Sequence, residues 1–127
     1  MDLYRPRLYF AHGQIFKGET YTAFLTSLAE RYPRQEVFLI QDTAPYHRGP
    51  VVREWLACYG HRFHICPLPA YSPEFNAIEP VWHHVRMHAT HNRYHATLPE
   101  FVSVLDATLD DVVAHPQQVQ GYLNPFL

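Results

Sequence analysis

Two acidic residues, Asp42 and Glu79, have the type and position needed to hold a divalent cation. Asp42 ends the predicted strand 37–42, which begins with a continuous apolar run as a buried strand would, and open α/β sheets bind their ligands where strands end. Glu79 follows the next predicted parallel strand, 63–68, so we expect both acids at the same end of the sheet. Carboxylates placed together repel unless a hard cation such as Mg²⁺ or Mn²⁺ binds them, and paired ions of this kind support phosphodiester chemistry.

The residue types alone leave a simpler alternative open. Asp42 can merely end a strand, and Glu79 can merely cap a helix. Asn76 precedes Glu79 at the spacing of a capping box, which predicts that Glu79 lies in the first turn of a helix. There the helix dipole favours an ionised carboxylate, so capping and metal binding both remain compatible with the spacing.

The elements that position these acids follow from short apolar runs that alternate with helical patterns, which is typical of an α/β domain. Pro33 and Gly60 end the first two predicted helices. The predicted order is strand 7–11, helix 21–32, strand 37–42, helix 51–59, strand 63–68, and helices over 78–89 and 98–113. Strand, helix and strand in succession predict a βαβ unit with parallel strands. We expect the strand at 37–42 to be covered on both faces, and the end after Pro116 to be loosely attached.

Composition limits the class of protein. A chain of 127 residues corresponds to one domain, and 47% hydrophobic residues suffice for a core. A net charge of −2 does not predict a basic nucleic-acid-binding module, although a local patch can still contact DNA. Cys58 and Cys66 form no disulfide framework. The absence of a signal peptide and of a membrane-spanning run predicts a cytoplasmic protein with no membrane partner.

Two segments resemble a known family: VFLIQDTAPYHR over 37–48, and LPAYSPEFNAIEPVWHHVRMHATHNRYHATLPEF over 68–101. They are similar to the DDE transposases of the mariner superfamily, in the bacterial insertion-sequence branch. Those enzymes carry Asp-Asn-Ala-Pro-x-His and then Tyr-Ser-Pro-x-Leu-Asn-Pro-Ile-Glu-x-x-Trp. The resemblance implies that Asp42 and Glu79 are the second and third catalytic acids. It also implies an RNase H-like fold (the integrase/transposase catalytic core), Mg²⁺ or Mn²⁺ as cofactor, and metal-dependent cleavage and transfer of DNA at transposon ends.

The sequence also departs from the family pattern. Thr43, Phe75 and Ala77 stand where the family has Asn, Leu and Pro. The family's first catalytic Asp has no clear counterpart, since Asp2 is the only aspartate before Asp42. We therefore interpret residues 1–127 as a single partial catalytic domain, truncated at the N-terminus, in which a βαβ unit is flanked by helices. Such a chain is expected to bind metal weakly and to be inactive alone.

Several further residues have open roles. His47 lies where the family also has His, and can contact DNA phosphate, orient a ligand or cap a helix. His83 and Arg86 share a helical face with Glu79 and are candidates for DNA phosphate contacts, or simply form a solvated face. Trp82 is expected in the core rather than stacked on a base. A zinc alternative rests on the spacing of His84, His88, His91 and His95.

Assembly is the last expectation. Without the family's first strand, the strand at 37–42 would keep a free apolar edge, and such edges pair readily. Either the segment 7–11 fills that place or a second molecule does, and we expect a homodimer. The alternative function is a non-catalytic interaction or dimerisation module derived from a transposase.

Overall fold

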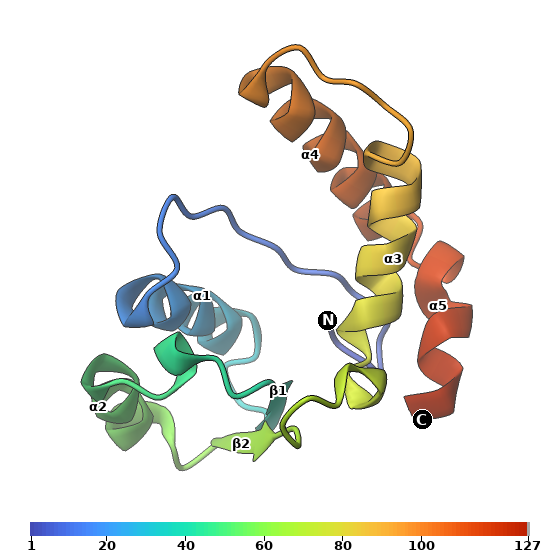
Figure 1. Ribbon diagram of the computed structural model, residues 1–127. Helices are drawn as coiled ribbons and strands as arrows, with labels where there is room; N and C mark the ends of the chain where they lie inside the picture. Colours follow the sequence, from blue (N-terminus) through green and yellow to red (C-terminus); the bar gives the residue numbers. More distant parts are fainter. Residues whose placement is uncertain (127) are drawn as a thin grey trace. The chain divides into compact units, whose positions relative to one another are not determined.

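The computed structural model describes residues 1–126, and its contacts divide the chain into two units (Figure 1). The strand unit is Ala11–Ser72, and the helical unit combines Met1–Phe10 with the chain from residue 73 onward. The strand unit contains α1 (Gly18–Arg31), β1 (Val37–Gln41), η1 (Pro45–His47), α2 (Pro50–Tyr59) and β2 (Phe63–Pro67). The helical unit contains η2 (Pro73–Phe75), α3 (Ile78–Ala89), α4 (Leu98–Ala114), α5 (Gln117–Leu123) and η3 (Asn124–Phe126).

The βαβ prediction is confirmed. β1 and β2 pair in parallel, in a register that runs from Val37 opposite Phe63 to Gln41 opposite Pro67, and α2 makes the crossover. α2 ends where predicted, but Gly60 has a φ of −62°, so its left-handed freedom is not used. Gly60 is needed for space instead, because a Cβ there would clash with the carbonyl oxygen of Leu56.

The prediction of a strand at 7–11 is wrong. That segment contributes only an isolated antiparallel bridge between Asp2 and Arg7. The Asp2 carboxylate accepts hydrogen bonds at 3.0 Å from the amides of Tyr4 and Arg5, which closes a turn just before the segment. Leu8 is then buried in the core of the helical unit, so its apolar character reflects core packing and not a strand.

The expectation that β1 is covered on both faces is also wrong. Its burial alternates, with Val37, Leu39 and Gln41 half-buried, while Phe38 and Ile40 are 64% and 49% exposed. A continuous apolar run therefore does not imply two covered faces here. The core of the strand unit is made by α1, α2 and β2, through Leu25, Leu28, Ala29, Val52 and Phe63.

In the helical unit, α3 packs against both α4 and α5 (Figure 1). The predicted start of α4 is confirmed, because the Thr97 hydroxyl accepts a hydrogen bond from the Glu100 amide at 3.2 Å. The expectation of a loose end after Pro116 is wrong, since α5 buries Val119 and Leu123 completely. These two residues are four apart and so share one helical face, which packs into the core. The core residues are Leu8, Ala77, Val81, Val85, Leu109, Val112, Val119 and Leu123.

Candidate metal-binding acids and the Asp42 network

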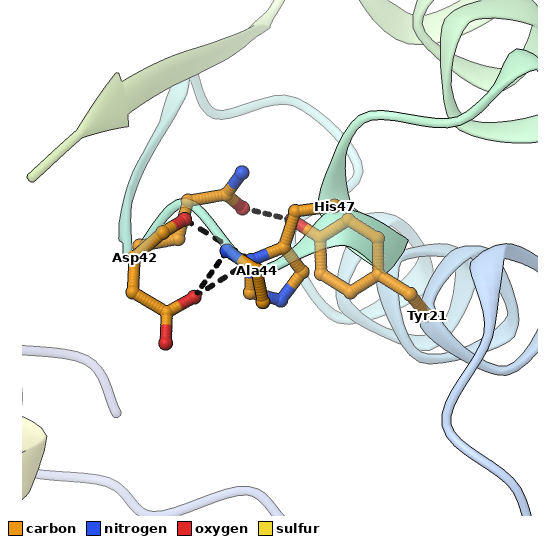
Figure 2. A network of polar contacts seen from close by, with 5 residues as sticks. Tyr21, Asp42, Ala44 and His47 are labelled. Carbon is orange, nitrogen blue, oxygen red and sulfur yellow. Dashed lines mark hydrogen bonds and ion pairs between the residues drawn. The ribbon is translucent and has the colours of Figure 1, made fainter. Parts of the chain in front are cut away.

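Asp42 directly follows β1, at the carboxyl end of a parallel strand, as predicted. Its side chain is 63% exposed. Its Oδ1 accepts a hydrogen bond from the amide of Ala44 at 3.1 Å and lies 3.0 Å from Nδ1 of His47. Figure 2 shows both contacts reaching the same carboxylate oxygen. An exposed carboxylate with one oxygen held in place is a suitable ligand for a hard cation, which prefers oxygen.

The imidazole of His47 is fixed on several sides. Its Nδ1 lies 3.0 Å from Oδ1 and 3.2 Å from the backbone oxygen of Asp42. Both are acceptors, so Nδ1 carries the hydrogen. The ring centroids of Tyr21 and Tyr46 lie 4.5 Å and 4.4 Å from that of His47, whose side chain is only 12% exposed. The helix-cap role considered for His47 is wrong, because α2 begins after Gly49 without a side-chain cap.

The residues that bond or pack around Asp42 form a network, here called the Asp42 network. Tyr21 belongs to it, although the sequence did not reveal this role. Its spacing assigns it to the apolar stripe of α1, yet its hydroxyl donates a hydrogen bond to Oε1 of Gln41 (Figure 2). Burial, followed by the nearby Tyr46 and Asp42, raises the pKa of Tyr21 to about 12. The phenol therefore stays protonated and remains a donor at neutral pH.

This shift in the pKa of Tyr21 predicts a loss of stability in alkali. A group whose pKa is raised on folding contributes stability below its unfolded pKa, 10, and loses it as the pH rises toward 12. After allowance for solvent screening, we expect the loss to be about 1 kcal/mol. Urea unfolding of wild type and Tyr21→Phe over this pH range measures it. A stability difference between the two proteins that stays constant across the range would contradict the prediction.

Glu79 lies in the helical unit, in the first turn of α3, as predicted. The side-chain oxygen of Asn76 accepts a hydrogen bond from the Ile78 amide at 3.3 Å, and the Glu79 amide donates to the Asn76 carbonyl at 3.0 Å. The predicted capping box is not formed, because Ala77 is the residue that precedes α3 and it makes no side-chain cap bond. Glu79 is half-buried, near the positive end of the helix dipole, where an ionised carboxylate is favoured.

Beyond Glu79, α3 turns three of the discussed side chains outward. His83 and Arg86 are exposed, which is compatible with a phosphate contact and equally with a solvated face. Trp82 is 38% exposed, so the expectation that it lies in the core is wrong. Val81 and Val85, with exposures of 0% and 1%, take the inward positions.

The histidine series does not continue along one helix. α3 ends at Ala89, and Asn92 has a φ of 54°, so His91 and His95 lie outside the helical spacing of His84 and His88. The rings of His84 and His88 stack with their centroids 4.1 Å apart. Burial, and then His88, lowers the pKa of His84. Over residues 1–126, no group of three or more His, Cys, Asp or Glu side chains is placed to hold a metal. The described residues therefore offer no set of ligands for the zinc alternative.

Comparison with known families shows which family the chain belongs to. Residues 6–102 match the family described as DDE superfamily endonuclease, and this stretch is most of the chain and contains both Asp42 and Glu79. A search of the curated proteins finds no match. The chain belongs to the DDE superfamily of endonucleases, which have an RNase H-like fold. Mixed helices and strands with a two-stranded parallel sheet are compatible with that fold. None of the described helices has the length and apolar character needed to cross a membrane.

Proposed function

We propose that this chain supplies two acids, Asp42 and Glu79, to the metal centre of a DDE transposase of the mariner superfamily, in the bacterial insertion-sequence branch. The observation that carries the proposal is Asp42 itself, an exposed carboxylate at the end of a parallel strand and inside the family match. Both units would belong to an RNase H-like catalytic domain. The partner would be DNA at transposon ends, in the cytoplasm.

The exposed carboxylate of Asp42 suits a hard divalent cation. Asp42 and Glu79 would bind Mg²⁺ or Mn²⁺ through carboxylate oxygens. When bound, such ions polarise the phosphodiester and activate the attacking oxygen. His83 and Arg86, exposed on α3, would hold DNA phosphate by charge-assisted hydrogen bonds. The resemblance assigns only two of the family's three acids to this chain, so we propose that it does not cleave DNA alone.

Asp2 gains no support as a replacement for the first acid. Its Oδ1 accepts hydrogen bonds from the amides of Tyr4 and Arg5, so its carboxylate already caps a local turn. Asp2 also lies at the end of no strand, since it makes only an isolated bridge with Arg7.

A manganese titration tests the proposal. Wild type is expected to bind Mn²⁺ with a Kd in the millimolar range, because few charged ligands give low affinity. Asp42→Asn keeps the shape of the side chain and removes its charge, and should weaken binding at least about tenfold, as should Glu79→Gln. Asp110→Asn, an exposed acid on α4, is the matched control and should bind like wild type. Identical isotherms for wild type and Asp42→Asn would remove the metal site.

One observation favours the alternative, an interaction or homodimerisation module. In the part of the chain that the structure describes, β1 pairs only with β2, and Phe38 and Ile40 are exposed on it. Exposed strands of this kind invite pairing. We expect a homodimer whose mass by light scattering is unchanged by EDTA. A monomer mass at high micromolar concentration would exclude it.

A further inference from the structure

Tyr21 reaches the Asp42 network from a different element. It lies in α1, whereas Gln41 ends β1 and His47 lies in η1. The Tyr21 hydroxyl bonds the Gln41 side chain, and its ring packs against His47 with the planes inclined at 44°. One side chain therefore contacts the residue before Asp42 in sequence and the imidazole that bonds the Asp42 carboxylate.

The orientation of His47 depends on these aromatic contacts. Tyr46 meets the ring edge-on at 74°, and Tyr21 packs on it from α1. A histidine side chain in solution rotates freely and chooses between two neutral tautomers. Here the rings hold Nδ1 toward Oδ1 of Asp42, at 3.0 Å, and toward the backbone oxygen of the same residue, at 3.2 Å.

We propose that Tyr21 is a positioning residue for Asp42 that acts through His47. Its ring holds the imidazole so that Nδ1–H donates to Oδ1, and its hydroxyl fixes Gln41 at the end of β1. The second carboxylate oxygen is then presented in one direction. The consequence for metal affinity rests on the proposed function, in which Asp42 is a ligand, since groups that orient a ligand tune its affinity.

The test measures the tautomer of His47 and the affinity for Mn²⁺ separately, on the full chain. Long-range ¹H–¹⁵N spectra of wild type should show neutral His47 protonated at Nδ1. Tyr21→Leu should lose that preference and raise the Kd for Mn²⁺ by about fivefold. Tyr21→Phe keeps the ring and should keep the tautomer. Tyr59→Leu is the matched control, because Tyr59 stacks on Trp55 in the same unit and should leave His47 unchanged.

The outcomes separate the two claims. A wild-type His47 protonated at Nε2 overturns the positioning role, and this measurement decides even if Tyr21→Leu does not fold. An unchanged tautomer in Tyr21→Leu, or the same change in Tyr59→Leu, also overturns it. A tautomer lost only in Tyr21→Leu supports positioning. If wild type then binds no Mn²⁺, the proposed function fails while the positioning of Asp42 stands.

Discussion

Replacing Leu123 by Ala is expected to lower the free energy of unfolding of the helical unit by about 3 kcal/mol. Leu123 is fully buried and belongs to the core that α5 shares with α3 and α4. Truncation removes buried apolar surface and leaves a cavity, because neighbouring helices relax only in part. Since small domains are marginally stable, this is a large share of their total stability.

Leu98→Ala is the matched control for this experiment. Leu98 is 72% exposed at the start of α4, so the same chemical change should alter stability by less than about 0.5 kcal/mol. Hydrogen exchange of α3 amides locates the effect in the helical unit. Equal, small effects of both substitutions would mean that α5 is not docked as described.

Replacing Arg62 by Met is expected to destabilise the strand unit by about 2 kcal/mol. The Arg62 guanidinium donates hydrogen bonds to the carbonyl oxygens of Ala29, Tyr32 and Gln35, around the C-terminal end of α1. It also lies 5.1 Å from the ring centroid of Phe63. A cation at a helix C-terminus satisfies terminal carbonyls and opposes the helix dipole, and Met keeps only the apolar stem.

Two arginine variants check the cause. Arg62→Lys keeps the charge but loses the planar fork, and should recover only part of the stability. Arg53→Met removes an exposed arginine on α2 and should change little. Denaturant unfolding, with hydrogen exchange at β1 and β2, measures each. If Arg53→Met cost as much as Arg62→Met, the loss would reflect surface charge and not these bonds.

The sequence correctly predicted those elements whose formation depends on residues close together in the chain. The βαβ unit and helices α3 and α4 follow from spacing and breakers, and α4 begins where predicted, with Thr97 as its cap. Tertiary packing decided the failures. The apolar runs near Leu8 and Leu123 have no unique local reading, and both turned out to be core segments of the helical unit.

The candidate site likewise contains residues that the sequence could place and one that it could not. Asp42 and Glu79 could be placed at a strand end and in a helix start from sequence alone. Tyr21 could not be connected to them, because its contact with His47 depends on how α1 packs and not on any spacing. A helical stripe assigns it to the core, and only the structure shows its hydroxyl bonded to Gln41.

Paramagnetic broadening by Mn²⁺ is the direct test of the proposal that Asp42 and Glu79 are metal ligands. Small amounts of Mn²⁺ added to ¹⁵N-labelled protein should broaden the amide signals of Thr43 and Ala44 together with those of Glu79 and Val81. In Asp42→Asn the signals of Thr43 and Ala44 should sharpen, because the substitution removes a carboxylate ligand. Broadening confined to the histidines of 83–95, or unchanged in Asp42→Asn, would contradict the account.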